Sequence, residues 1–290
     1  MTLQSVSINA RNLKRRKITN SVMIFLCILS AVITVLPLLY IFFYTTKSGI
    51  SSLNLDFFTQ LPKPVGETGG GMANAIVGSI ILVSIGGVIG IPIGILTGIY
   101  ISEYSKSIFS TIIKFTTDIL SGVPSIIVGI FAYGIFVIPM QGYSALAGGF
   151  ALGVLMIPTV TKITEEMLKL VPQSLREASL ALGVSRWKTT LRIVLSSASS
   201  GIITGVLLAI ARAAGETAPL IFTSFGNSFW QTNINEPISA LPLQIFVYAT
   251  SPFEDWHRQA WAGAFVLIFL VFTVNLIVRY VTRNKFSGNL

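Results

Sequence analysis

Charged side chains are scarce in this sequence. Only 11% of its 290 residues are Asp, Glu, Lys or Arg, and 52% are hydrophobic, whereas ordinary soluble domains carry about 25% charged residues. Uncharged apolar runs of about 18 residues or more recur along the chain, and about 20 helical residues cross the ~30 Å hydrocarbon core of a bilayer. The scarcity of charge therefore excludes a soluble globular protein and predicts an all-α integral membrane protein.

Residue types that bind metals or nucleotides are also nearly absent. The sequence has one cysteine and one histidine, so it can form no internal disulfide and is poorly equipped for a metal site. The pattern G-x-x-x-x-G-K-[ST], which cradles nucleotide phosphates, does not occur, and the glycine-rich stretch 86–94 is typical of helix packing instead. We expect no catalytic residue, metal or cofactor in this chain, and any ATP hydrolysis to take place on a partner.

Basic residues outnumber acidic ones by 20 to 11, but their positions do not indicate a nucleic-acid-binding protein. They lie mostly between the apolar runs, where the positive-inside rule explains them. With the N-terminus inside, 16 Lys and Arg residues fall on the inner side and three on the outer side. We therefore expect both termini to be cytoplasmic and no nucleic-acid partner.

The apolar runs predict six membrane-spanning helices. The run 119–161 is uncharged for 43 residues, about 64 Å as a helix, so it is interpreted as two spans joined by a turn within 139–149. The uncharged segment 237–253 is only 17 residues long and contains three prolines, which favours an interfacial or re-entrant element over a seventh span. The predicted spans are 21–44, one within 73–102 that is broken by Pro92, two within 119–161, then 199–223 and 259–278.

These spans divide the chain into four regions. A basic tail, 1–20, precedes a first span and an extracytoplasmic segment, 21–72, and this first apolar run is too long for a cleaved signal peptide. A core of five further spans, 73–282, contains a cytoplasmic loop at about 165–196. A short cytoplasmic tail, 283–290, completes the chain.

Two charged residues lie inside the predicted fifth span. Arg212 and Glu216 are four positions apart in the stretch ARAAGETAPL, with no other charge from 193 to 235. A charged side chain in a span costs about 2.5–3.5 kcal/mol on insertion scales, so it normally faces a cavity or a partner. Pro219 disturbs the helix at the same depth, and irregular backbone inside a membrane normally lines a cavity. The pair, with Thr217 beside it, is therefore a candidate substrate pathway.

The chemistry of the pair favours an oxyanion that keeps a proton. The planar guanidinium of Arg212 suits a tetrahedral oxyanion. The carboxylate of Glu216 repels sulfate, which is fully deprotonated, but accepts a hydrogen bond from phosphate, which carries a proton at neutral pH. The alternative is a structural salt bridge. The hydroxyls of Ser121, Ser125 and Thr217 can likewise contact a passing anion or serve only as packing groups.

The predicted cytoplasmic loop contains the pattern of two short helices joined by a glycine. Pro172 suits the first turn of a helix, and Gly183 suits its C-terminal cap. The apolar residues between them recur at helical spacing and share one face: Leu175, Ala178 and Leu182. Such a shape suits a knob that docks into another protein's groove. The alternative is an amphipathic loop that rests on lipid headgroups.

The stretch EASLALGVSRWKTTLRIVL in this loop resembles the EAA loop of ABC-importer permeases. Glu177, Ala178 and Gly183 match the family's pattern, whereas Ser179 replaces its second alanine and Ser196 stands where the family often has proline. In that family the loop is the coupling helix that fits into the ATPase subunit. The resemblance therefore implies that Glu177, Ala178 and Gly183 couple this chain to an ATPase.

A second resemblance is more specific. The stretches ARAAGETAPLIFT and DILSGVPSIIVGIF resemble the A-type permease subunit of phosphate ABC importers, and the similarity covers about 73–282, with a weaker match before it. It implies a type I ABC importer permease in the prokaryotic plasma (inner) membrane, with the family's arginine and glutamate at Arg212 and Glu216. Besides the lipid bilayer, the implied partners are a C-type permease subunit in a heterodimer, two copies of an ATPase subunit and an extracytoplasmic phosphate-binding protein.

Together these observations predict one half of the membrane channel of an ATP-driven phosphate importer, and no enzyme in its own right. One alternative is a permease for another oxyanion such as phosphonate. The other is a stand-alone secondary anion transporter or channel. That alternative requires inverted repeats or paired broken helices, and neither is visible in the sequence.

Two further groups of charged residues have both a structural and a functional interpretation. Asp118 lies four residues after Lys114 at the cytoplasmic mouth of the third span, where it is expected to form a helix cap or an ion pair, or else a gate contact. Glu254, Asp255 and His257 cluster on the predicted outer side. They are expected to anchor the interface, or else to contact the binding protein.

Overall fold

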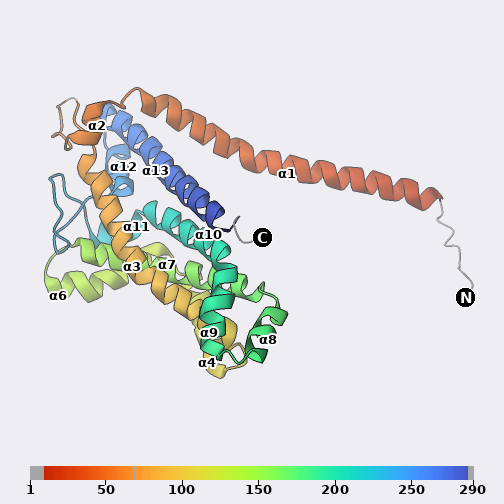
Figure 1. Ribbon diagram of the computed structural model, residues 1–290. Coiled ribbons are helices and arrows are strands. Elements are labelled where there is room, and N and C mark those ends of the chain that lie inside the picture. Colours follow the sequence, from red (N-terminus) through yellow and green to blue (C-terminus); the bar gives the residue numbers. More distant parts are fainter. Residues whose placement is uncertain (1–9, 68, 287–290) are drawn as a thin grey trace, which may run out of the picture.

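The structure is a computed structural model that describes residues 10–67 and 69–286. Within these residues every regular element is a helix, as the sequence predicts (Figure 1). The predicted tails 1–20 and 283–290 lie partly outside the described residues. The elements are α1 (Ala10–Ile50), α2 (Leu55–Thr59), α3 (Ala73–Glu103), α4 (Ile108–Gly122), α5 (Ser125–Ala132), the π-helix η1 (Tyr133–Val137), α6 (Ile138–Met140), α7 (Ala145–Lys169), α8 (Gln173–Ala181), α9 (Arg186–Thr189), the π-helix η2 (Thr190–Val194), α10 (Leu195–Ala214), α11 (Ala218–Thr223), α12 (Leu241–Ala249) and α13 (Glu254–Phe286).

Five helical runs of the described chain are long and apolar enough to cross a bilayer. They are α1, α3, α7, the continuous run from α9 through η2 to α10, and α13. A sixth crossing is present when α4 and the run from α5 to α6, which form one bent pair, are counted as one span. With that count the described residues agree with the six predicted spans.

Helix α1 projects away from the rest of the molecule (Figure 1). It contacts α13 near its own C-terminal end, where the ring of Tyr44 packs edge-on against Trp261 at a centroid distance of 5.0 Å. The side chains of 21–44 are all exposed, and most are apolar. Because a helix that is apolar on every side is stable only when lipid or protein surrounds it, α1 has the surface that a first membrane span needs.

A row of glycines lets α3 and α7 run side by side at close range. The row recurs every fourth residue along α3: Gly86, Gly90, Gly94 and Gly98. A Cβ atom on Gly90 would lie 2.6 Å from the carbonyl oxygen of Gly153 on α7, so only glycine fits there. Small residues promote helix association in membranes because they allow extensive van der Waals contact. The packing role predicted for the stretch 86–94 is therefore confirmed.

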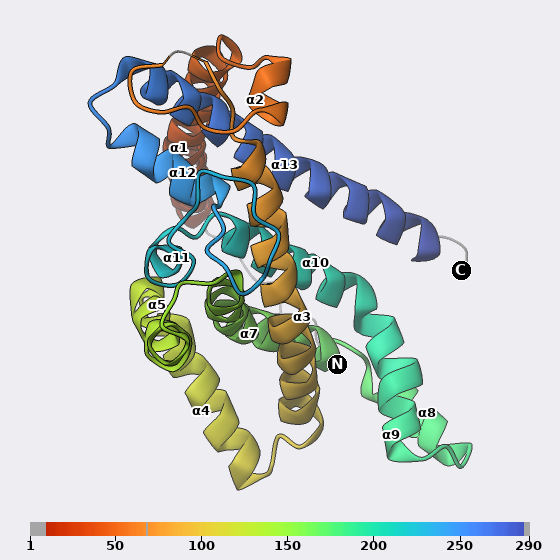
Figure 2. The ribbon, with the colours of Figure 1, turned by 90° about the vertical axis from the view of Figure 1, so that its left-hand side faces the viewer.

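Two segments that contain proline differ from the sequence prediction. Helix α3 continues through Pro92, so the predicted break there is wrong; membrane helices tolerate proline because neighbouring groups satisfy the freed carbonyl. In contrast, α4 and α5 are bent by 103° at Val123 and Pro124 (Figure 2), so the third span is not one straight helix. The residue before a proline avoids the α-helical region, and Val123 accordingly has a ψ of 127°.

The proline-rich segment 237–253 contains only the nine-residue helix α12. This helix packs against α13 and α3, at the end of the molecule that also carries α2 (Figure 1). Its Tyr248 stacks on Trp256 with ring centroids 4.5 Å apart. Nine helical residues are too few to cross a bilayer. The prediction that this segment is not a seventh span is therefore confirmed.

Candidate substrate pathway and coupling surface

The helix that carries Arg212 ends close to it. Helix α10 stops at Ala214, and the chain resumes as α11 only at Ala218, with Pro219 in the first turn. The continuous span predicted at 199–223 is therefore wrong, because the helical run is Arg186–Ala214. Proline accounts for the break, since it cannot continue the preceding turn but is favoured where a helix begins. Arg212 thus lies in the last turn of α10.

Arg212 and Glu216 form a loose ion pair at this break. The Nε of Arg212 lies 3.6 Å from the Oε1 of Glu216, which is too long for a hydrogen bond. The side chain of Arg212 is 57% exposed, and that of Glu216 is 17% exposed. Charged groups are costly against lipid. The open face beside Arg212 is therefore one that water, an anion or another subunit must cover, and the guanidinium keeps donors free for it.

Contacts along α7 set the depth of Arg212. Three contacts pair α7 with α10 and α11 in an antiparallel register: Met167 with Gly201, Ile163 with Gly205, and Gly148 with Leu220. Arg212 follows Gly205 by seven residues, and in this antiparallel register the residue at the same level of α7 is Met156, seven residues before Ile163. Because Met156 lies near the middle of the α7 helix, Arg212 lies well inside the membrane-spanning part of the molecule.

The bend between α4 and α5 falls at the same depth. Helix α4 also runs antiparallel to α7, with Asp118 bonded to Lys162 across the two helices. The bend at Val123 is five residues beyond Asp118, so the same register places it about one and a half turns further along α7, near Met156. Two interruptions of the helical backbone therefore lie at the level of Arg212.

The segments that follow the two breaks contact each other. Helices α5 and α11 pack together, and a Cβ on Gly129 would lie 2.6 Å from the Cα of Pro219. The expectation that the chain has no paired broken helices is therefore wrong: the described residues contain a pair. The sequence did not reveal it because the first bend is hidden in a run of 43 uncharged residues. Irregular backbone at membrane depth normally lines a cavity, so the two breaks favour a passage beside Arg212.

Two of the three hydroxyl groups considered for the pathway, those of Ser121 and Thr217, are directed at backbone carbonyls. The Oγ1 of Thr217 lies 3.5 Å from the carbonyl oxygen of Pro242, at the limit of hydrogen bonding. The hydroxyl of Ser121 donates to the carbonyl of Thr117 at 2.9 Å. Thr217 therefore ties the break to α12 while remaining next to Glu216 in the chain. A direct contact between these hydroxyls and an anion stays a prediction.

The loop at the other end of α7 folds as the sequence predicts, into a helix, a glycine and a second helix. Helix α8 follows Pro172, and Gly183 has a φ of +78°. The N–H of Val184 donates to the carbonyl of Ser179 at 3.3 Å, and the N–H of Gly183 donates to that of Leu180 at 2.9 Å. These two bonds form a Schellman cap, which needs a residue in the left-handed region. The predicted role of Gly183 as the cap is confirmed.

Several large apolar side chains of this loop are uncovered in the single chain. Its large exposed side chains are Leu175, Leu180, Leu182 and Trp187. Glu177 and Ala178 are exposed as well. The loop lies at the opposite end of the molecule from α12 (Figure 1). Because an exposed apolar patch with polar neighbours is typical of an interaction site, the residues predicted to dock are available for docking.

Polar contacts that the sequence did not reveal attach the loop to the spans. The hydroxyls of Ser179 and Thr189 lie 2.8 Å apart in a buried contact between α8 and α9. Arg176 forms an ion pair with Glu103 at the end of α3 and donates to the carbonyl of Leu168 at 3.0 Å. Only the departure of Ser179 from the family pattern hinted at the first contact. Nothing in the sequence pairs Arg176 with a residue 73 positions away.

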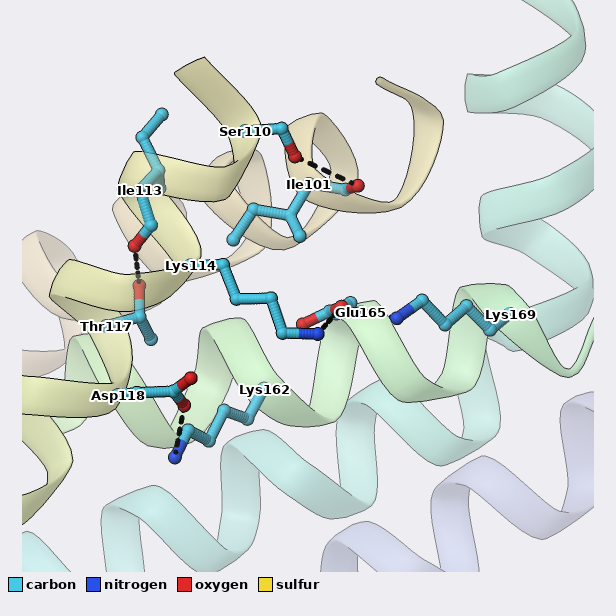
Figure 3. A network of polar contacts seen from close by, with 9 residues as sticks. All are labelled: Ile101, Ser110, Ile113, Lys114, Thr117, Asp118, Lys162, Glu165 and Lys169. Atoms are coloured by element: carbon cyan, nitrogen blue, oxygen red, sulfur yellow. Dashed lines mark hydrogen bonds and ion pairs between the residues drawn. The ribbon is translucent and has the colours of Figure 1, made fainter. Parts of the chain in front are cut away.

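A cluster of ion pairs joins α4 to α7 near the same end (Figure 3). Glu165 is 7% exposed and accepts a hydrogen bond from Lys114 at 2.9 Å and another from Lys169. Asp118 forms an ion pair with Lys162 at 2.9 Å. The ion pair predicted for Asp118 is therefore present, but its partner is on α7 rather than on its own helix.

Two of the polar residues in the first turns of α13 have local contacts. Asp255 forms an ion pair with Arg258, and the Nε2 of His257 lies 2.6 Å from the carbonyl oxygen of Ser251. Glu254 is exposed at the start of the helix. These contacts stabilise the turn, and the anchoring and docking interpretations of the cluster both stay predictions.

Comparison with known families identifies the class of the protein. Residues 90–286 match the family described as "Binding-protein-dependent transport system inner membrane component". The match covers more than half of the chain, and the chain belongs to this family. It is a multi-pass inner-membrane component of a transport system.

Individual relatives have a more specific name. A Haemophilus influenzae protein, "Phosphate transport system permease protein PstA", is 45% identical over 271 residues that cover 93% of this chain and 96% of the relative. A Yersinia pestis protein of the same name is 47% identical and covers 86% of this chain and 84% of its own. The resemblance to the A-type permease subunit, drawn from the motifs around Arg212, is thereby confirmed.

A solved structure shares the fold. A chain of the MetNI methionine ABC transporter in an inward-facing conformation superposes with a TM-score of 0.55 at 17% identity, covering 73% of this chain and 93% of that one. This likeness concerns the fold alone. It agrees with the predicted architecture of a type I ABC importer permease.

Proposed function

We propose that this chain is the transmembrane permease subunit of an ATP-driven importer of inorganic phosphate and forms half of the translocation pathway. The observation that carries the proposal is the loose ion pair between the exposed Arg212 and the partly buried Glu216 at the break between α10 and α11. Relatives at 45% and 47% identity that are named phosphate permeases support the choice of substrate.

The geometry suits an anion that approaches from the open side of α10. Arg212 is 57% exposed and bound loosely by one carboxylate, so an oxyanion can displace that partner and accept two parallel hydrogen bonds from the guanidinium. Glu216 then accepts the proton of the anion as a hydrogen bond. Sulfate has no such proton at neutral pH, so the carboxylate of Glu216 repels it. Thr217 lies next to Glu216 and completes the polar wall of the break.

Coupling to ATP takes place through the loop that contains α8 and α9. Glu177, Ala178 and Gly183 form the part that fits a separate ATPase subunit, of which the complex has two copies. ATP is hydrolysed there and not on this chain. A C-type permease subunit covers the exposed face beside Arg212 and supplies the other half of the pathway, and an extracytoplasmic binding protein delivers phosphate. Both termini of this chain are cytoplasmic.

Two alternatives make different predictions. A permease for another oxyanion, such as phosphonate, has the same partners but a different substrate. A stand-alone secondary anion transporter needs no ATPase, and the pair of broken helices, α4–α5 and α10–α11, is a feature such transporters share. Membership in a binding-protein-dependent family favours the ATP-driven importer over it.

Purification of the intact complex tests the proposal. The chain, tagged at its C-terminus, is isolated in mild detergent, the subunits that accompany it are identified, and ATP hydrolysis is measured after reconstitution with the binding protein. We expect a second permease and an ATPase, and faster hydrolysis with phosphate but not with sulfate. Stimulation by phosphonate alone supports the first alternative. Anion flux through the purified chain without ATP supports the second and contradicts the proposal.

A further inference from the structure

We propose that Lys162 forms a second oxyanion-binding site, which the transported anion meets after Arg212 on its way toward the α8–α9 end of the molecule. The inference rests on the proposed function, because it assigns a second binding site to the same anion. It is carried by the direction of the Lys162 side chain, its depth, its exposed partner Asp118 and the charge of its surroundings.

Lys162 points to a side of α7 that its neighbouring helices leave open. A Cβ on Gly98 of α3 would meet Thr164, and a Cβ on Gly205 of α10 would meet Ile163. Successive helical residues are rotated by about 100°, so Lys162 is about 200° from Thr164 and projects away from α3, toward the space between α4 and α10. Its side chain is 40% exposed, in agreement with this position.

Lys162 and Arg212 border the same seam between α7 and α10. Arg212 follows Gly205 by seven residues, two helical turns, so it projects from the α10 face that is directed toward α7. It lies level with Met156. Lys162 is six residues beyond Met156 on α7, which is about 9 Å along the helix axis. An anion that leaves Arg212 along this seam toward the α8–α9 end therefore passes Lys162.

The immediate surroundings of the two cations are alike. Each is paired with one carboxylate: the Nε of Arg212 with Glu216 at 3.6 Å, and the Nζ of Lys162 with Asp118 at 2.9 Å. Asp118 is 51% exposed, so an anion can replace it on the ammonium without leaving a carboxylate buried and unpaired. As at Arg212, a neighbouring carboxylate favours a tetrahedral oxyanion that still carries a proton.

The chemistry of lysine suits a site for release. An arginine holds an oxyanion through a rigid fork of donors, whereas the ammonium of lysine acts as a compact, strongly hydrated point charge on a flexible stem. Lys162 therefore binds the same anion less specifically than Arg212 does. A weaker second site lets the anion leave Arg212 and then leave the protein.

The other ion pairs of the cluster keep the site in place and make it positive (Figure 3). Glu165 is nearly buried between Lys114 and Lys169, and removal of either partner would leave a buried charge poorly compensated. Glu165, with Lys114 and Lys169, therefore anchors α4 to α7 and is not a binding site. The residues that these bonds connect are three lysines and two carboxylates, so the cluster has a positive charge in excess.

A purely structural ion pair makes a different prediction from an anion site. If Lys162 and Asp118 only hold α4 against α7, Lys162→Gln and Asp118→Asn break the same bond and have the same effect. If Lys162 binds the anion, the two variants differ, because Asp118→Asn keeps the cation and frees it for the anion. Lys162→Arg preserves the charge in either case.

The first test compares these variants in the complete reconstituted complex. We expect Lys162→Gln to lower the initial rate of phosphate uptake at least about fivefold, while Asp118→Asn and Lys162→Arg keep at least about half of it. Lys106→Gln removes the same charge from an exposed turn outside the cluster and serves as the matched control. Equal losses for Lys162→Gln and Asp118→Asn, or no loss for Lys162→Gln, overturn the inference.

A chemical test shows whether uptake needs a positive charge at residue 162. Cys27 is the only cysteine of this chain, so Cys27→Ser with Lys162→Cys gives one labelling position once reactive cysteines of the partner subunits are replaced. An aminoethyl thiosulfonate reagent restores a positive charge and should restore uptake, whereas a sulfonatoethyl reagent should not.

The outcomes separate this inference from the proposed function. If the Cys27→Ser parent takes up phosphate, but the aminoethyl group at residue 162 restores no uptake to the Lys162→Cys variant, the second site is rejected and the importer remains. If the parent takes up no phosphate at all in an assembled, ATP-hydrolysing complex, the proposed function itself fails.

Discussion

Arg212 illustrates how a single residue receives its role from the backbone next to it. The guanidinium lies in the last turn of α10 because Pro219 forces the helix to end and restart. In a continuous helix Glu216 would lie one turn further on the same face as Arg212. The break instead holds the carboxylate 3.6 Å from Nε and keeps the arginine exposed, which is the arrangement an exchangeable anion needs.

Gly183 sets the backbone conformation of the loop that contains α8 and α9. Its φ is +78°, and a Cβ there would meet no atom within 4 Å. A substitution is therefore opposed by backbone strain and not by lack of space. We expect Gly183→Val to cost about 1–2 kcal/mol locally and to tilt α9 away from α8, because a β-branched residue avoids the left-handed region.

Gly183→Asn is the matched control, because asparagine enters the left-handed region far more readily. In the reconstituted complex Gly183→Val should abolish most ATP-driven uptake while the protein still assembles with the partner permease, and Gly183→Asn should keep at least about half of the uptake. Normal uptake by Gly183→Val would show that the loop is not the coupling element.

Residues at the ends of elements were easier to predict than long-range pairs. Gly183 has a signal in the sequence because a glycine that follows an apolar periodicity is a common helix cap. The ion pair of Arg176 with Glu103 has none, because it joins residues 73 positions apart, one on α8 and one at the end of α3. The charge pair of Arg212 and Glu216 was visible because charges inside an apolar run are rare.

At the scale of elements, the most extensive contact between spans of the described residues is that of α3 with α7. The glycines at every fourth position of α3 allow it, and Gly90 lies where a Cβ would approach the carbonyl oxygen of Gly153 to 2.6 Å. Backbone cannot move aside as a side chain can. A larger residue at this position must therefore push the two helices apart.

We expect Gly90→Val to destabilise the chain by about 1–3 kcal/mol, the range typical of an overpacked core. Gly87→Ala is the control, because a Cβ on Gly87 meets nothing nearer than the flexible end of Ile91 at 3.4 Å. The measurement is the midpoint of thermal unfolding in detergent, which should fall clearly for Gly90→Val and change little for Gly87→Ala. Equal midpoints would mean that the α3–α7 contact is not a tight one in solution.

Span lengths determine how well the elements can be predicted. Helices α1, α3, α7 and α13 lie where long apolar runs indicated them, because few charges and sufficient length are enough to predict a span. The bend at Pro124 was missed because the whole surrounding run is apolar, so hydropathy does not mark where the chain changes direction. Pro92 shows the opposite error: a proline is a break only where neighbouring groups do not satisfy the freed carbonyl.

At the scale of the molecule, α9 at the cytoplasmic-loop end and Arg212 belong to one helical run. From Arg186 the chain proceeds through α9, η2 and α10 to Ala214, so Trp187 and Arg212 lie near opposite ends of one helical run, which changes direction along its length (Figure 2). Arg176 additionally joins α8 to the ends of α3 and α7. We therefore expect a movement of the loop to reach the depth of Arg212.

The arrangement predicts a definite orientation in the membrane. A reporter enzyme that is active only outside the cytoplasm should be inactive when fused after Leu290 and active when fused after Asn233, which lies in the exposed segment between α11 and α12. The basis is the excess of basic residues on the side that carries α8 and α9. An active fusion at Leu290 would mean that the bent pair α4–α5 does not cross the membrane as one span.

The central claim is that phosphate passes Arg212 under the control of Glu216, and uptake of radioactive phosphate and sulfate by proteoliposomes that contain the whole complex tests it most directly. Loss of a charge-assisted hydrogen-bond donor is worth about 1.5–3 kcal/mol, so Arg212→Gln should lower phosphate uptake about tenfold or more at unchanged assembly. Glu216→Gln should keep part of the phosphate flux and admit sulfate. Full uptake by Arg212→Gln, or complete rescue by the exchange of Arg212→Glu with Glu216→Arg, would contradict the account, because either result would leave the pair with a structural role alone.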